Sequence, residues 1–86
     1  MRNSNYYLLA FNSTHDAVAA EKYLLSQLNV TMMPTLRKIT ASCGISVRIE
    51  EADFEHLKKM LDLNSSIKES CMPYHIKDEE VIPIEI

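Results

Sequence analysis

Apolar residues recur along the chain with two spacings, and these spacings predict the first elements. Residues 5–11 are apolar at both odd and even positions, which is typical of a central strand covered on both faces. Apolar positions three and four apart then predict a helix over residues 14–28. Ser13 or Thr14 can cap its first turn. The chain therefore begins with a strand followed by an amphipathic helix.

The middle of the chain predicts two further strands. Residues 30–33 are short and partly β-branched, and they end at Pro34, which cannot donate to a ladder and so indicates an edge. Residues 43–50 alternate between apolar and polar positions, as expected of a half-buried strand. In this pattern Ser46 and Arg48 lie on the polar side.

The last third predicts a second helix, a last strand and a tail. The acidic residues of 51–53 suit a helix start, and an apolar stripe follows until the polar stretch 64–66. Residues 67–76 are interpreted as the last strand, weakened at Pro73 and therefore expected at an edge. Residues 77–86 change from acidic to apolar and form a C-terminal tail.

The resulting order, β-α-β-β-α-β, predicts an α+β, ferredoxin-like two-layer sandwich with a four-stranded antiparallel sheet. Residues 1–76 form this single domain, and residues 77–86 lie outside it. In this topology the first and third strands are neighbours. The loop after the first strand, the hairpin between strands two and three, and the start of strand four share one edge. Residues 13–16 and 37–44 should therefore lie together.

Composition excludes several classes of function. A formal net charge of −3 and a pI near 5.5 argue against a nucleic-acid partner. No apolar run approaches the roughly 20 residues that span a bilayer, and no signal peptide is evident. The two cysteines and three histidines do not have the spacing of a zinc site, so we expect neither a metal nor another cofactor. Two cysteines without a disulfide framework favour reduced thiols in the cytoplasm.

The most specialised stretch of the chain is residues 33–44. It ends in the single glycine, Gly44, preceded by Cys43, and it contains the cation Arg37. Glycine tolerates positive φ and close approach of other groups, so we expect Gly44 to supply one of these and to leave the neighbouring thiol accessible. In the same stretch Lys38 is a second cation, and hydroxyl groups come from Thr35, Thr40 and Ser42.

Three motifs carry a resemblance to a known family: Ser13-Thr14-His15-Asp16-Ala17, Met33-Pro34-Thr35-Leu36-Arg37 and Ser42-Cys43-Gly44-Ile45. Together they resemble the small bacterial proteins called putative selenium/sulfur carrier protein-like. The resemblance covers about residues 7–61. Leu36 stands where the family pattern often has a second proline, which predicts a less rigid loop here. The resemblance implies a carrier of sulfur or selenium, with hypothetical donor and acceptor proteins as partners.

For such a carrier, Cys43 is the candidate thiol, holding the chalcogen as a persulfide or selenosulfide. A thiolate is favoured near a helix N-terminus and near cations, which Thr14 and Arg37 place in this region. His15 is a candidate base or hydrogen-bond partner for the sulfur, or else a solvated residue of the first turn. Cys43 could instead be a small apolar residue that closes the core. Cys71, inside the last strand, is interpreted as structural.

The alternative function is a non-catalytic module that binds a small anion or a protein. Its candidate ligand-binding residues are Arg37, Thr40, Ser42, Gly44 and Thr14. An enzyme is the weakest hypothesis, because the chain shows no nucleophile–base–acid set and no phosphate-binding glycine loop.

The first strand also predicts an assembly. If its odd positions face the helices, then Tyr6, Leu8 and Ala10 are exposed on the other face of the sheet. Exposed apolar patches on small domains usually mark interfaces. We expect a homodimer through this face, with coverage by the chain's own C-terminal tail as the alternative.

Overall fold

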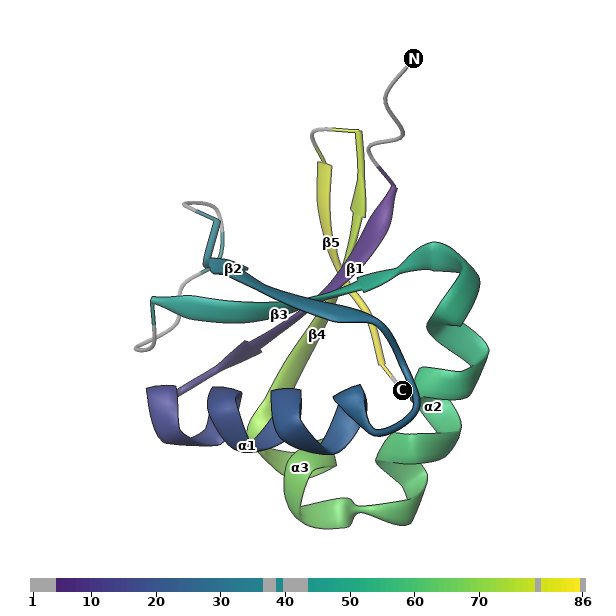
Figure 1. Ribbon diagram of the computed structural model, residues 1–86. Helices are drawn as coiled ribbons and strands as arrows, with labels where there is room; N and C mark the ends of the chain where they lie inside the picture. The colour runs from purple at the N-terminus through teal and green to yellow at the C-terminus, as the bar shows by residue number, and fades with distance from the viewer. Residues whose placement is uncertain (1–4, 37–38, 40–43, 79, 86) are drawn as a thin grey trace.

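Five antiparallel strands form one sheet, and three helices pack on one of its faces (Figure 1). This architecture comes from a computed structural model, which describes residues 5–36, 39, 44–78 and 80–85. The strands are β1 (Tyr6–Phe11), β2 (Val30–Pro34), β3 (Ile45–Glu50), β4 (Cys71–Lys77) and β5 (Glu80–Pro83). The helices are α1 (Thr14–Leu25), α2 (Phe54–Leu63) and α3 (Ser65–Ser70), with a 3-10 turn, η1 (Glu51–Asp53), before α2. The predicted α+β class is confirmed.

β1 is the centre of the sheet, whose strand order is β2-β3-β1-β4-β5. Both of its faces are covered: Leu8, Leu9, Ala10 and Phe11 expose no surface. The apolar pattern at both parities therefore predicted its position correctly. The expected pairing of the first and third strands is also confirmed, with Leu9 opposite Val47.

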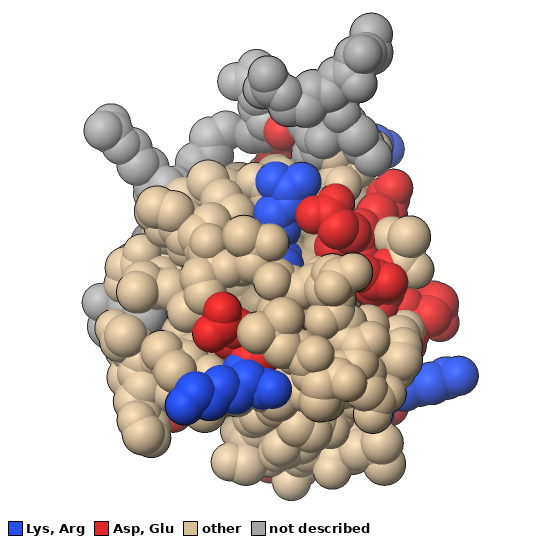
Figure 2. All heavy atoms as spheres, in the orientation of Figure 1, with Lys and Arg blue, Asp and Glu red and all other residues tan. Residues whose placement is uncertain are grey.

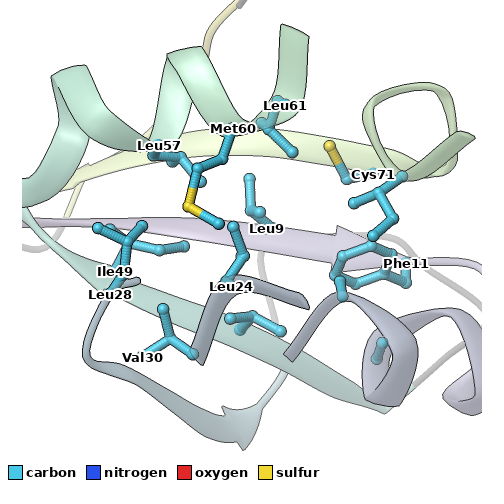
Figure 3. Close-up of a cluster of buried hydrophobic side chains, with 14 residues drawn as sticks. Leu9, Phe11, Leu24, Leu28, Val30, Ile49, Leu57, Met60, Leu61 and Cys71 are labelled. Atoms are coloured by element: carbon cyan, nitrogen blue, oxygen red, sulfur yellow. The ribbon is translucent and has the colours of Figure 1, made fainter. Parts of the chain in front are cut away.

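The main core lies between the sheet and the helices (Figure 3). Leu9 and Phe11 from β1 meet Leu24 of α1 and the α2 side chains Leu57 and Leu61 there. All five are fully buried. Each such side chain stabilises the fold by roughly 1.5–3 kcal/mol relative to an exposed one, so this cluster holds the helices on the sheet.

A second, smaller cluster lies on the face of the sheet that carries no described helix. Leu8, Ala10, Ile39 and Ile76 are buried in it, and Val81 packs against it. The expectation that Leu8 and Ala10 are exposed is therefore wrong, because side chains of this same chain cover them. Ile39 contributes from the segment between β2 and β3, and the pattern of apolar and polar residues did not predict this burial.

The last predicted strand began too early, since residues 65–70 form α3 and β4 begins at Cys71. The Asn64 side chain accepts a hydrogen bond of 3.3 Å from the backbone N–H of Ile67, which caps this helix. Ile67 itself is buried in the main core. A cap followed by one apolar anchor makes a short helix here, although Ile67 alone favours a strand.

The predicted four-stranded sheet is also wrong, because residues 80–83 of the supposed tail form β5 on β4. β4 is therefore an interior strand rather than an edge. Pro73 is tolerated in it because Pro73 lacks only the N–H that would point toward β5. On that side its carbonyl accepts from the backbone N–H of Ile84 at 3.1 Å, which continues the ladder beyond β5. The β1 side of the ladder is not interrupted.

Candidate functional site

The antiparallel register brings the described residues that flank the predicted site to one end of the sheet. At the end of β1, Ala10 lies opposite Ser46 of β3, and Phe11 lies opposite Cys71 of β4. Figure 1 shows the end of β2, the start of β3 and the first turn of α1 together on the left of the view. The loop after the first strand thus lies at the same end of the sheet as the starts of the third and fourth strands, as predicted. The rest of that prediction concerns the hairpin between the second and third strands, of which residues 37, 38 and 40–43 lie outside the described residues.

The N-terminus of α1 is capped by Ser13, one of the two candidates that the sequence offered. The Ser13 hydroxyl accepts a 3.1 Å hydrogen bond from the backbone N–H of Asp16. Thr14 and His15 follow in the first turn, and both are exposed. Since the dipole of this 12-residue helix places partial positive charge at its N-terminus, anionic groups are stabilised beside this turn.

Gly44 lies directly before β3 and is exposed. Its carbonyl oxygen accepts a 3.0 Å hydrogen bond from the backbone N–H of Thr35, which extends the β2–β3 ladder by one pair. The expectation for Gly44 is wrong in both its forms. Gly44 does not have positive φ, and a Cβ added to it would meet no atom within 4 Å. Gly44 therefore leaves unfilled space beside the start of β3 and introduces no backbone strain.

A hydroxyl pair that the sequence did not predict joins β2 and β3 close to Gly44. The side chains of Thr35 and Ser46 lie 2.7 Å apart, oxygen to oxygen, within hydrogen-bonding distance. Ser46 exposes no surface, although its alternating position predicted the polar side of β3. The signal that was available is the short polar side chain itself, which fits a buried position when a partner hydroxyl faces it.

The Ile39 side chain is a second anchor in this region. It is 6% exposed and packs with Leu8 and Ala10, while its backbone N–H donates to the carbonyl of Leu36 at 3.0 Å. Of the described residues between β2 and β3, Thr35 and Gly44 thus continue the strand pairing and Ile39 packs on the sheet.

Cys71 is on the opposite side of β1 from β3, and it is buried. Its sulfur lies 3.3 Å from the carbonyl oxygen of Lys68, to which the thiol donates. Burial raises the pKa of the Cys71 thiol from 9.0 to about 11, more than the nearby Lys68 charge lowers it. The thiol is therefore protonated at neutral pH, which agrees with its structural interpretation.

A groove of about 540 Å³ lies beside Cys71, between α3 and the segment after β5. Its lining includes Lys68, Pro73 and Ile84. The Lys68 ammonium is held by the Asp62 carboxylate at 2.7 Å, so it is not a free cation for a ligand.

Four of the predicted site residues lie outside the described residues: Arg37, Thr40, Ser42 and Cys43. The structure describes the other three, Thr14, His15 and Gly44, and all of them are exposed at the end of the sheet described above. No group of three His, Cys, Asp or Glu side chains able to hold a metal occurs among the described residues. Every helix among the described residues is too short or too polar to cross a membrane.

Comparison with known families gives one match over most of the chain. The family model described as Putative Se/S carrier protein-like covers residues 6–71, which include the segments of all three motifs named above. Neither the curated proteins nor the solved structures give a match. The matched range runs from the start of β1 to the first residue of β4, so it includes Thr14, His15 and Gly44. The chain belongs to the Putative Se/S carrier protein-like family.

Proposed function

We propose that this protein carries sulfur or selenium on Cys43, as a persulfide or selenosulfide, between a donor protein and an acceptor protein. Family membership supports a carrier role in general. We further propose that it works in the cytoplasm of a bacterium and that binding and transfer, rather than catalysis of a substrate reaction, are its activity.

The observation that carries the choice of thiol concerns the other cysteine. Cys71 is 9% exposed, and its pKa near 11 leaves almost no thiolate at neutral pH. The thiolate is the nucleophile in sulfur exchange, so Cys71 is poorly suited to accept a cargo. Because the chain has two cysteines, the carrier role falls to Cys43.

The surroundings of Gly44 support the same assignment. Cys43 is bonded to Gly44, which is exposed at the end of the sheet where α1 begins. A helix N-terminus lowers the pKa of a nearby thiol by stabilising its anion. We propose His15 as the base or hydrogen-bond partner of the sulfur. For the charged cargo, we propose Arg37, Thr40, Ser42, Gly44 and Thr14 as binding residues.

The proposed transfer balances without an added oxidant. The Cys43 thiolate attacks the outer sulfur of a donor persulfide, R–S–SH. A new S–S bond forms at Cys43, the donor S–S bond breaks, and the donor leaves as its thiolate, R–S⁻. Delivery is the reverse step, with an acceptor thiolate attacking the outer sulfur held on Cys43. A donor R–S–SeH transfers selenium in the same way.

Intact mass spectrometry of the full chain tests this function. After incubation with a low-molecular-weight persulfide and removal of the excess, we expect a gain of the mass of one sulfur atom. Cys71→Ser should retain this gain, and Cys43→Ser should lose it. The proposal is wrong if neither thiol of the folded chain takes up sulfur, or if Cys71 alone does.

Two structural proposals accompany this function. The order β2-β3-β1-β4 is the order expected of a ferredoxin-like sandwich, and we propose to class the fold so, with β5 as an addition. We also keep the homodimer as a proposal. Its contact would use the partly buried side chains of the helix-free face, among them Tyr6, Met72 and Tyr74.

A further inference from the structure

The outer edge of β2 carries backbone groups that no described residue pairs. The Thr35–Gly44 hydrogen bond fixes which groups point outward, because hydrogen-bonded pairs alternate along an antiparallel ladder. In the register that pairs Met33 with Ser46, the odd positions of β2 bond to β3. The N–H and C=O groups of Val30 and Met32 therefore point away from the sheet.

This edge has only weak protection against pairing with another strand. Sheets usually protect their edges with charged side chains, prolines or short strands. β2 contains no charged residue in a chain that is 24% charged, and Pro34 protects only its last position. The other edge, β5, is shorter, begins with Glu80 and includes Pro83. Of the two edges in the described structure, β2 is thus the open one.

An apolar groove of about 250 Å³ lies at the Pro34 end of this edge. It is lined by Met32, Met33, Pro34, Gly44 and Ile45. Ligand pockets for small molecules usually hold 300–1,000 Å³, so this groove suits a single apolar side chain better than a free metabolite. Most of the acidic side chains that Figure 2 shows gather at the right of the view, whereas the end of β2 lies at the left in Figure 1.

We propose that the β2 edge is the docking site for an extended, uncharged segment of the protein that exchanges cargo with this chain. The segment adds a sixth strand through the Val30 and Met32 backbone groups and places one apolar side chain in the groove. Strand addition of this kind takes its affinity from main-chain hydrogen bonds and its specificity from side-chain pockets. The identity of the partner rests on the proposed carrier function, but the strand addition itself does not.

A second copy of this chain fits the edge less well. In a symmetric pairing centred on Met32, Val30 of the second copy lies opposite Pro34. Val30 is 9% exposed and packs into its own core, so it cannot fill the groove. β2 has five residues, whereas a stable interface takes roughly 20–30 residues and roughly 800 Å² from each partner, so pairing through β2 alone would be far too small. A short contact suits a transient partner, as a carrier needs.

Docking here brings the partner to the proposed transfer site. Gly44 lines the groove, and Cys43 is the residue bonded to it. A segment that runs along β2 toward Pro34 therefore ends beside the place where sulfur would be exchanged.

The probe for this proposal is an end-blocked peptide of alternating Thr and Leu, about eight residues long so that it spans β2. It is titrated into the full wild-type chain while amide hydrogen exchange is followed residue by residue. We expect saturable slowing of exchange at the Met32 amide. The amides of Thr31 and Met33, which already bond to β3, should change little.

Two controls make the outcome specific. Met32→Pro removes the outward N–H without touching the β2–β3 ladder, and Met32→Leu keeps that N–H at a similar volume. We expect Met32→Pro to bind the peptide at least about tenfold more weakly than Met32→Leu does. Because Met32→Pro could also disturb folding, the wild-type chain is tested with the same peptide N-methylated at every amide, which should not bind.

The proposal is overturned if the parent peptide causes no saturable protection of Met32. Equal binding of the N-methylated peptide overturns it too, because side chains alone would then carry the contact. Sulfur loading of Cys43 is measured without any peptide. A failure of strand addition is therefore distinguishable from a failure of the carrier function.

Discussion

The Thr35 hydroxyl lies 2.7 Å from the Ser46 hydroxyl, where the last residues of β2 meet the first residues of β3. Ser46 is fully buried and Thr35 is partly buried, so the Thr35 hydroxyl supplies the hydrogen-bond partner that the Ser46 hydroxyl cannot obtain from water. The same Thr35 donates its backbone N–H to Gly44. Thr35 therefore joins the end of β2 to the start of β3 through both its side chain and its backbone.

We predict that Thr35→Val destabilises the fold by about 1–3 kcal/mol, because it leaves the buried Ser46 hydroxyl without its partner. Urea unfolding followed by circular dichroism measures the change. The double variant Thr35→Val, Ser46→Ala should recover part of the loss, since it removes both polar groups together. Strictly additive effects of the two single changes would show that the hydroxyl pair contributes no coupling energy.

Gly44→Ala should leave stability within about 0.5 kcal/mol of the wild type. Gly44 does not have positive φ, and the added Cβ would enter open space. Alanine also reduces the freedom of the unfolded chain, which opposes any small loss. Thermal unfolding of the variant checks this, and a loss of more than about 1 kcal/mol would mean that the backbone there is constrained.

Gly44 and the buried residues Ser46 and Ile39 differ in how much the sequence could reveal about them. An unusual glycine beside a cysteine led correctly to an exposed place at the end of the sheet, but its conformational role could not be deduced from composition. The buried Ser46 and the inserted Ile39 depend on which segments meet across the sheet, and hydrophobic alternation along one strand does not contain that information.

The same reason explains which elements were predicted well. β1 and α1 have local patterns that tertiary packing does not override, whereas α3 depends on the Asn64 cap and on the burial of Ile67. β5 could not be distinguished from a tail because its pairing partner, β4, supplies the hydrogen bonds that define it. For the candidate site, the sequence proposed the region and the motifs, and the structure adds the buried contacts of Thr35, Ser46 and Ile39 beside it.

Cys71 should be alkylated far more slowly than Cys43 at neutral pH. Its burial and its pKa near 11 keep the thiol protonated and covered, while we predict an accessible thiolate at Cys43. Brief treatment with iodoacetamide at pH 7 followed by peptide mapping measures both sites. Preferential labelling of Cys71 in the folded chain would reverse the assignment of the carrier thiol. Denatured protein, in which both thiols react, is the control.

The raised pKa of Cys71 also predicts a pH dependence of stability. In the folded state the Cys71 thiol keeps its proton up to about pH 11, whereas in the unfolded state this thiol loses its proton near pH 9.0. The folded state therefore binds more protons between these values, and its stability falls as pH rises through this window. Below pH 9 the contribution is fully present. Urea unfolding at pH 8 and at pH 10 should show a smaller loss in Cys71→Ala than in the wild type, and equal losses would contradict the assigned cause.

The last prediction concerns the helix-free face, where the burial of Ile39 decides how much apolar surface is left for a partner. Ile39→Ala removes the side chain that packs on Leu8 and Ala10. We expect a loss of about 2 kcal/mol, at the low end for buried isoleucine because Ile39 belongs to the smaller of the two buried clusters. Urea unfolding measures this loss, and a change below about 0.5 kcal/mol would mean that Ile39 does not cover the sheet.

The same variant tests the proposed homodimer. If two copies meet through this face, uncovering Leu8 and Ala10 enlarges the apolar contact, and the dimer should become tighter rather than weaker. Sedimentation equilibrium of the wild type and of Ile39→Ala over a range of concentrations measures both association constants. Leu63→Ala is the matched control, because that side chain is 82% exposed on α2, away from this face. A wild type that is monomeric at every concentration would refute the dimer. A chain that associates equally with and without Ile39 would place the contact elsewhere on the surface.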